Sequence, residues 1–331
     1  MAQITVMMAA YNAERYIRRA LDSLLAQTFR DFDVIIIDDG SRENTGTIAD
    51  DYARRDDRIH VVHQKNSGVC AARNASLDWA YANSDSNWLT FVDSDDWVHP
   101  EMLERLLNAA RENNVLISAC GYEETAGANP IVRTEELKPV CWKTMDFYQA
   151  HYINATMMCC KLYHKDCYRS IRHPVDNYFD DECVSYKILY AQENMAVIPA
   201  PLYAYFINTT GHTKDKWTPK RLDAWEAYEQ QIAFFEQRGE WDLVRFRYRG
   251  YLENAVVNEA DARQAQDSPE VLAARKRIHA TIKNLLKRMS RLHYLEFWPD
   301  SELLLRYFPV RARIYRLYLE TRARLERKKN A

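Results

Sequence analysis

The chain of 331 residues is long enough for one catalytic domain with a smaller appendage. Its composition, 47% hydrophobic and 28% charged with 8 glycines and 10 prolines, is that of a globular protein and excludes a low-complexity chain. No run approaches the length of uninterrupted apolar residues that a membrane-spanning helix needs, which excludes an integral membrane protein.

The cysteines and the charge distribution indicate the cellular compartment and the kinds of partner. The 7 cysteines are an odd number without a C-x-x-C pair, and no basic segment of a secretory signal opens the chain, so we expect free thiols in the cytoplasm. Residues 270–331 carry 16 Lys/Arg against 6 Asp/Glu, a net charge of +10, whereas the whole chain carries −2. Residues 1–269 therefore carry −12, and the two parts are expected to meet different partners.

The first 120 residues alternate predicted strands and helices. Helices follow the strands, with Asn12 as the predicted N-cap of the first, Gly68 opening another and Pro100 in the first turn of one ending near Glu112. Continuous β-branched runs are typical of strands buried on both faces. Strands are predicted at residues 4–10, 34–37, 59–62, 88–92 and 115–120. This order predicts an α/β fold with a doubly wound, mostly parallel sheet.

Polar clusters follow three of these strands. They are Tyr11-Asn12, Asp38-Asp39 and the run from Asp93 to Asp96. Ligands of doubly wound sheets bind beyond the carboxyl ends of the strands, so we expect the three clusters to meet at one rim.

The acidic run from Asp93 to Asp96 gives the most specific indication of chemistry. Asp93, Asp95 and Asp96 place three carboxylates in four residues, and such close charges raise one another's pKa unless a cation lies among them. Mn²⁺ or Mg²⁺, bound by one or two carboxylates and by substrate phosphate, would relieve the repulsion. A solvated loop with acids near a helix N-terminus explains the same residues equally well.

The Asp38-Asp39-Gly40-Ser41 segment has two interpretations. Asp-Gly is a common turn pair, and a plain turn accounts for it. A carboxylate at a strand end can also accept a hydrogen bond from the ring N–H of a nucleobase. The neighbouring motifs favour this second interpretation.

Four motifs occur in the order and spacing of family 2 glycosyltransferases: Ala10-Tyr11-Asn12, Asp38-Asp39-Gly40-Ser41, residues 66–74 and residues 91–96. The sequence resembles this family strongly over residues 2–115, resembles it again at 161–163, 179–182 and 201–205, and diverges after about residue 216. The resemblance implies the glycosyltransferase A fold and a bacterial enzyme of capsule, exopolysaccharide or lipopolysaccharide synthesis that uses a UDP-sugar.

The resemblance also assigns site residues. Asp39 would meet the uracil ring, Asp93 would face the ribose or sugar, and Asp95 would hold Mn²⁺ or Mg²⁺. Gly68 and Arg73 lie on the segment that closes over base and phosphates. The nucleotide-sugar site as a whole comprises Ala10, Tyr11, Asn12, Glu14, Asp39, Gly68, Arg73, Asp93 and Ser94.

Asp181 matches the family's catalytic base. The implied reaction is a single displacement with inversion, in which a carboxylate takes the proton of an acceptor hydroxyl as it attacks; such a base contributes about 10²–10⁴-fold. Without the resemblance, Asp180-Asp181-Glu182 would be the acidic first turn of a helix from about Cys183 to Gln192. His212 lies where some relatives supply a further metal contact, and a surface histidine is the alternative.

Two positions depart from the family pattern. Ala9 stands where the family usually has proline, which should affect only local stiffness. Cys159 stands where an aromatic residue is common, so a sugar-stacking ring is missing and inferences about the acceptor are weakened.

From Trp217 onward the sequence predicts helices without a catalytic motif. We therefore predict a nucleotide-sugar-binding and catalytic domain over residues 1–216 and a helical C-terminal extension over 217–331. A helix packed on the catalytic domain is predicted by apolar residues spaced three to four apart: Trp225, Tyr228, Ile232 and Phe235.

The last segment, residues 310–331, interleaves basic with apolar residues. Such a helix can lie peripherally on the anionic inner face of the cell membrane, and it can equally be a solvated helix with packed apolar residues. No recognised motif indicates nucleic acid as a partner. The basic residues are Arg311, Arg313, Arg316, Arg322, Arg324, Arg327, Lys328 and Lys329.

Other classes of protein fit the motifs less well. A dinucleotide-binding dehydrogenase needs a glycine-rich turn after the first strand, and residues 9–14 contain no glycine. A sugar-nucleotide pyrophosphorylase needs a Gly-rich, basic N-terminal loop, which is also missing. The alternative of a non-catalytic glycan-binding or scaffold protein of the same fold stays open, although the intact Asp93, Asp95 and Asp181 argue against it. The acceptor is expected to be a glycan or a lipid-linked acceptor.

Overall fold

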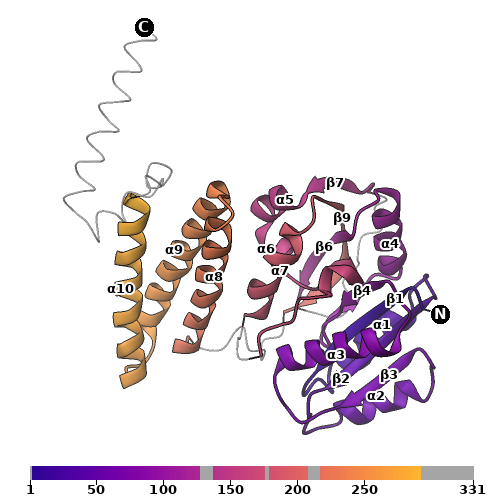
Figure 1. Cartoon of the computed structure of the whole chain (residues 1–331). Coiled ribbons are helices and arrows are strands. Elements are labelled where there is room, and N and C mark those ends of the chain that lie inside the picture. The colour runs from indigo at the N-terminus through magenta and orange to yellow at the C-terminus, as the bar shows by residue number, and fades with distance from the viewer. Residues whose placement is uncertain (1, 127–136, 176–178, 208–216, 292–331) are drawn as a thin grey trace. The chain divides into compact units, whose positions relative to one another are not determined.

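The structure, a computed structural model, describes residues 2–126, 137–175, 179–207 and 217–291 (Figure 1). The chain divides into two compact units, Met1–Asp215 and Lys216–Ala331.

The first half of unit 1 is a parallel sheet with one helix after each strand. Strands β1 (Ile4–Ala10), β2 (Phe32–Asp38), β3 (Ile59–His63) and β4 (Trp88–Phe91) lie in the order β3-β2-β1-β4. Helices α1 (Ile17–Leu25), α2 (Thr45–Ala53) and α3 (Val69–Asn83) connect them. The register pairs Ala10 with Asp38, so the loops after β1 and β2 start side by side. The predicted alternation of strand and helix in this half is confirmed.

The second half extends the same sheet and is less regular. After β5 (Trp97–Val98) and α4 (Met102–Glu112), strand β6 (Ile117–Thr125) runs parallel to β9 (Asn194–Phe206). Strand β8 (Lys161–His164) lies between β4 and β6 and is antiparallel to both. The remaining elements of this half are β7 (Val140–Lys143), α5 (Thr144–Ala150), α6 (Tyr152–Thr156), the short η1 (Lys165–Tyr168) and α7 (Asp180–Tyr190).

The core lies on both faces of the sheet. Val34, Ile35, Ile36 and Ile37 of β2 are all fully buried, as the continuous β-branched run predicts. Burial of each such side chain contributes about 1.5–3 kcal/mol to stability. The sheet is mostly parallel and doubly wound, and the predicted fold class is confirmed.

Three predicted helix boundaries differ from the structure. Asn12 does not cap α1, which begins at Ile17; its φ is +50° and its side chain bonds to the loop after β2 instead. Helix α4 begins two residues after Pro100, which therefore precedes the helix. Helix α7 begins at Asp180, so the three acids at 180–182 form its first turn.

Unit 2 is helical in the part that the structure describes. It contains η3 (Pro219–Asp223), α8 (Ala224–Glu236), α9 (Trp241–Gln264) and α10 (Pro269–Arg291), and α9 packs against both α8 and α10. The predicted apolar face of α8 is buried on α9: the Trp225 indole donates to Asn254 over 2.9 Å, and Tyr228 stacks on Tyr251.

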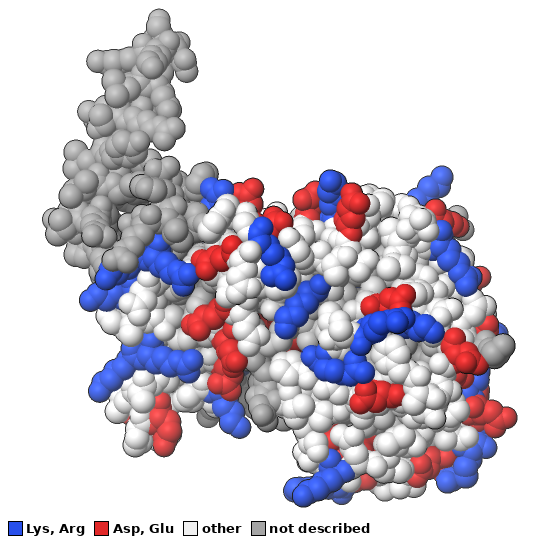
Figure 2. Space-filling model, in the orientation of Figure 1, with Lys and Arg blue, Asp and Glu red and all other residues white. Residues whose placement is uncertain are grey.

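Surface charge is mixed. Figure 2 shows lysine and arginine side chains interspersed with aspartate and glutamate over the visible face. Among the described helices, none is long and apolar enough to cross a membrane. The basic segment 310–331 and His212 lie outside the described residues.

Candidate active site

The loops after β1 and β2 are bonded to each other. The backbone N–H of Asn12 donates to the Ser41 hydroxyl over 3.0 Å, and the Asn12 side chain accepts from the Arg42 backbone over 2.9 Å. The Glu14 carboxylate accepts from the backbone and the side chain of Asn44, both over 3.1 Å. Asparagine tolerates the left-handed backbone that Asn12 adopts at this bend. The structure therefore brings the predicted nucleotide residues of both loops to one rim.

Asp39 fastens a third loop to this rim. It is buried, and its Oδ1 accepts from the Ser67 backbone over 2.9 Å and from the Gln64 side chain over 2.7 Å. Its Oδ2 accepts from the Gly68 backbone over 2.8 Å. A carboxylate has about four acceptor positions, so three protein donors leave room for about one more. These bonds to the 64–68 loop were not foreseen from the sequence.

Gly40 makes the close approach of these loops possible. Its φ is +72°, and a Cβ built on it would lie 2.7 Å from the backbone nitrogen of Asn66. Only glycine fits both the conformation and the space. The Asp-Gly pair is therefore a turn, and the same turn presents Asp39.

Arg73 gathers three carboxylates at the end of β4. Its Nη1 lies 2.7 Å from Asp180 Oδ2 and 2.7 Å from Asp181 Oδ1, and its Nη2 lies 3.3 Å from Asp93 Oδ1. The guanidinium is buried, and the three acids outweigh the cost of burial and raise the pKa of Arg73 well above its usual value. In this structure, Arg73 thus faces the acids, whereas the sequence places it on a segment closing over the nucleotide.

Asp95 is not one of the three carboxylates that contact Arg73. Burial, with the nearby Asp93 charge adding to it, raises the pKa of Asp95 to about 6. Arg19 Nη2 donates over 3.0 Å to the backbone carbonyl of Asp95, so it leaves the carboxylate itself without this bond. A hard divalent ion among Asp93, Asp95 and substrate phosphate would relieve this repulsion, and the oxygen donors present suit Mn²⁺ or Mg²⁺.

Within the described residues, no three His, Cys, Asp or Glu side chains are arranged to hold a metal by themselves. This is compatible with an ion bound by one or two carboxylates whose remaining positions are filled by substrate oxygens and water.

Asp96 has a structural role that the sequence did not indicate. It is 1% exposed, and it accepts from the Tyr203 hydroxyl and from the Phe206 backbone, each over 2.7 Å. The same Tyr203 oxygen accepts from the Asp93 backbone over 3.1 Å. Asp96 therefore ties the acidic loop to the end of β9. Burial, with the charges of Asp93 and Asp95, raises the pKa of Asp96 well above its usual value.

Asp181 and Asp180 are adjacent in sequence and differ in environment. The side chain of Asp181 is 32% exposed, whereas that of Asp180 is 6% exposed. Burial raises the pKa of Asp181 to about 7, with Arg73 opposing and Asp180 and Asp93 adding to the rise. Asp181 Oδ2 also faces the backbone N–H of Met158 at 3.4 Å.

The remaining predicted residues lie at the same edge of the sheet. The Ala10 carbonyl accepts from the Asp39 backbone over 2.9 Å, and Tyr11 is exposed. Ser94 lies in the turn between Asp93 and Asp95 and is half-buried. Cys159, at the position where relatives often have an aromatic residue, is buried beside β4.

This fold is found in solved glycosyltransferase structures. S. aureus TarS 1–349, in complex with UDP-GlcNAc, matches with a TM-score of 0.56 at 17% identity, over 93% of this chain and 78% of that one. The mannosyltransferase PcManGT from Pyrobaculum calidifontis, in complex with GDP-Man and Mn²⁺, matches with a TM-score of 0.54 at 15% identity, over 88% and 84%. The class is therefore that of the glycosyltransferase A fold.

Sequence comparisons define the family. The sequence model of Glycosyl transferase family 2 matches residues 5–172, just over half of the chain. GlyA, a glycosyltransferase of Streptococcus pneumoniae, is 25% identical over 287 residues, which are 79% of this chain and 41% of GlyA. EpsH of Bacillus subtilis is 28% identical over 272 residues, 77% of this chain and 74% of EpsH. The chain belongs to glycosyl transferase family 2 and is a glycosyltransferase by family.

Proposed function

We propose that this protein is an inverting glycosyltransferase that moves a sugar from a UDP-sugar to a hydroxyl of a glycan or lipid-linked acceptor, as in the synthesis of a bacterial surface polysaccharide. The observation that carries the proposal is the contact of Arg73 with both Asp93 and Asp181. This contact joins the acidic loop after β4 to the carboxylate in the first turn of α7. TarS, solved with UDP-GlcNAc, supports a UDP-sugar as donor.

The donor would lie along the rim formed by the loops after β1 and β2. Asp39, Asn12 and Glu14 fix these loops, and the remaining acceptor position of Asp39 suits a ring N–H of the base. Asp95 would hold Mn²⁺ or Mg²⁺ with the donor pyrophosphate, and the ion would supply stabilisation of the charge that develops on the leaving phosphate. The Mn²⁺ in the PcManGT complex is in keeping with this assignment.

Asp181 would act as the general base. As the acceptor oxygen forms its bond to the anomeric carbon, its proton passes to the Asp181 carboxylate and the bond to the nucleotide diphosphate breaks on the opposite face. The side chain is 32% exposed, so part of it is open to an incoming hydroxyl. A pKa near neutral makes the carboxylate a stronger base than an ordinary aspartate.

The two units would divide the work. We assign donor binding and catalysis to residues 1–216 and propose that the helical extension, 217–331, with its basic tail, brings the enzyme to the inner face of the cell membrane. His212 stays a candidate for a further metal contact. Neither assignment is needed for the chemistry at Asp181.

The test is release of UDP from a panel of UDP-sugars with Mn²⁺, using full-length protein. Asp181→Asn should abolish transfer while leaving UDP affinity largely unchanged, because the base is lost and the nucleotide loops are not. Asp57→Asn, which changes an exposed aspartate in the same unit, is the matched control and should keep full activity. Retained turnover in Asp181→Asn would remove it as the base. Failure of the wild-type protein to bind any nucleotide sugar would favour a non-catalytic glycan-binding or scaffold protein.

A further inference from the structure

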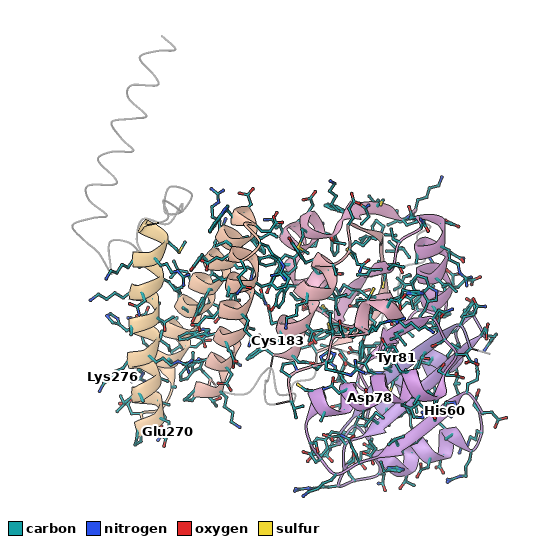
Figure 3. All side chains as sticks on the ribbon, viewed as in Figure 1. His60, Asp78, Tyr81, Cys183, Glu270 and Lys276 are labelled. Atoms are coloured by element: carbon teal, nitrogen blue, oxygen red, sulfur yellow. The ribbon has the colours of Figure 1, made fainter. Side chains whose placement is uncertain are left out.

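The segment before α7 is fastened to α3, the helix that carries Arg73. Asn74 Nδ2 donates to the His173 carbonyl and Asn74 Oδ1 accepts from the His173 N–H, each over 2.8 Å. Asp78 and Tyr81, both labelled in Figure 3, add an ion pair with Arg172 at 2.9 Å and a hydrogen bond to the Lys165 carbonyl over 2.6 Å. His173 is therefore held in place by backbone and side-chain bonds that do not involve its ring.

The ring of His173 lies against Asp180. Its side chain is fully buried, and Nδ1 lies 2.7 Å from Asp180 Oδ2, the oxygen that also lies 2.7 Å from Arg73 Nη1. Tyr168 stacks on the ring and Phe91 meets it edge to face. Burial lowers the pKa of His173, so the ring is neutral near pH 7 and can offer one N–H.

Two carboxylates thus share one guanidinium nitrogen, and they differ in their other contacts: His173 lies against Asp180, and the backbone N–H of Met158 faces Asp181 at 3.4 Å. Asp180 is nearly inaccessible and is contacted by both Arg73 and His173, whereas Asp181 keeps an exposed edge. Although burial opposes it, Arg73 and His173 hold the pKa of Asp180 well below the usual range. Asp180 is accordingly the permanent anion of the pair.

We propose that Asp180 is a positioning residue, oriented by His173, that takes up the charge of Arg73 and so leaves the Asp181 carboxylate available to accept the proton of the acceptor hydroxyl. Without Asp180, Arg73 Nη1 would pair with Asp181 alone and would hold it as an ordinary ion-paired carboxylate, which is a weak base. This inference rests on the proposed role of Asp181.

The other titratable groups that face Asp181 are consistent with these different roles of Asp180 and Asp181. Arg73 and Lys161 are the cations among them, and the ammonium of Lys161 is directed at the carbonyls of Asn154 and Met157. The thiols and phenols have raised pKa values and are uncharged near neutral pH. Among the described residues, these groups include Cys70 and Arg73 on α3, Asp93 after β4, Cys159, Lys161 and Tyr163 at β8, Tyr168 on η1 and Asp180 on α7.

The test measures the ionisation of Asp181 without a donor or acceptor. A carboxylate whose pKa is raised on folding lowers stability as pH rises above its unfolded value, and the loss is complete above the folded pKa. The free energy of unfolding of wild-type protein minus that of Asp181→Asn, followed from pH 4 upward, should therefore fall and level off near the folded pKa of Asp181, about 7. The same difference is then measured between Asp180→Asn and the double variant.

We expect the pH at which this stability difference levels off to be at least about one unit lower when Asp180 is replaced. One neighbouring anion is then removed, and Arg73 turns to Asp181. A merely structural role for Asp180 would lower all stabilities and leave the levelling point where it was. Levelling at the same pH in both pairs would overturn the proposal. Loss of transfer in Asp181→Asn is a separate result and decides only the proposed function.

His173 variants give a second route, which also serves if Asp180→Asn does not fold. His173→Leu removes the ring N–H beside Asp180, and His173→Asn can offer an amide N–H near the position of Nδ1. The levelling point should shift down in His173→Leu, by less than in Asp180→Asn, and return toward the wild-type value in His173→Asn. Identical levelling points in the wild type and both His173 variants would contradict the role of His173.

Discussion

At the scale of single residues, identical side chains in adjacent positions make different contacts. Asp38 contacts His63 Nδ1 at 2.9 Å, whereas Asp39 holds the 64–68 loop. Asp180 is the buried partner of Arg73, and Asp181 is the accessible one. The alternation of side chains at a strand end and the packing of a helix turn, rather than residue type, decide which contacts each carboxylate of a pair makes.

The pH dependence of the reaction should follow the ionisation of Asp181. A general base works only when deprotonated, so below a pKa of about 7 the rate should fall roughly tenfold per pH unit and should reach a plateau above it. Initial rates of UDP release between pH 5 and 9, at low donor concentration, would check this. An acid limb centred near pH 4, the ordinary value for aspartate, would argue against the raised pKa.

Asp95 should govern the dependence on the divalent ion. Replacement by alanine removes a carboxylate oxygen from the proposed ion site, and we expect donor affinity in the presence of Mn²⁺ to fall roughly tenfold or more, since even outer-shell changes cost that much. Titration of donor binding against Mn²⁺ concentration measures it, with Asp57→Ala as the control. An unchanged Mn²⁺ dependence would count against Asp95 as a ligand.

Residue motifs were largely predictable from the sequence, and their contacts were not. The aspartates after β2 and β4 follow continuous apolar runs, so their place at a strand end could be predicted. The bond from Arg73 to Asp180 joins residues 107 positions apart, and His173 carries no sequence signal because it belongs to no motif and meets Asp180 only in the folded chain. Only tertiary packing brings these residues together.

At the scale of elements, the rim depends on turns that let three loops approach one another. Gly40 and Gly239 both have left-handed backbones, with φ of +72° and +74°, but only at Gly40 would a Cβ clash, at 2.7 Å from Asn66 N. Gly239→Ala should cost about 1–2 kcal/mol for the backbone alone. Gly40→Ala should cost more and should also weaken donor binding, because the 64–68 loop must move.

Urea unfolding of both glycine variants, with UDP binding measured in parallel, provides the comparison. Equal losses of stability and unchanged UDP affinity in Gly40→Ala would show that the loops can adjust. The Gly239 variant separates the conformational cost from the clash, since nothing lies within 4 Å of its added Cβ.

The parallel strands were predictable and β8 was not. Strands β1 and β2 have seven residues each, whereas β8 has four and begins with a lysine, which normally indicates an exposed position. Here Lys161 is fully buried, with its ammonium at the carbonyls of Asn154 and Met157. The satisfied carbonyls offset part of the cost of burying the charge.

At the scale of the whole molecule, the two units carry different predictions. The family model matches residues 5–172, which lie in unit 1, and the chain spans 41% of GlyA. Unit 2 has the predicted C-terminal helices over the part that the structure describes, residues 217–291. Its role at a membrane rests on the composition of residues 310–331.

Deletion of residues 310–331 should reduce binding to anionic vesicles while leaving UDP release intact. Each Lys or Arg near such a surface contributes about 1 kcal/mol, and the segment holds eight. Co-sedimentation with vesicles of phosphatidylcholine alone and of phosphatidylcholine with phosphatidylglycerol, at low and high salt, would measure it. Equal binding of both proteins would favour the alternative, in which the segment packs on the protein itself.

The position of β8 has a consequence for how the chain folds during its synthesis. This strand fills the gap between β4 and β6 but is synthesised after both, so until residue 161 emerges the nascent sheet carries two open edges at its centre. A chain interrupted before that point would contain β1 to β6 and would lack both β8 and β9, which is synthesised later still and pairs with β6. Translation pauses or premature stops between β6 and β8 should thus yield fragments prone to edge-to-edge association.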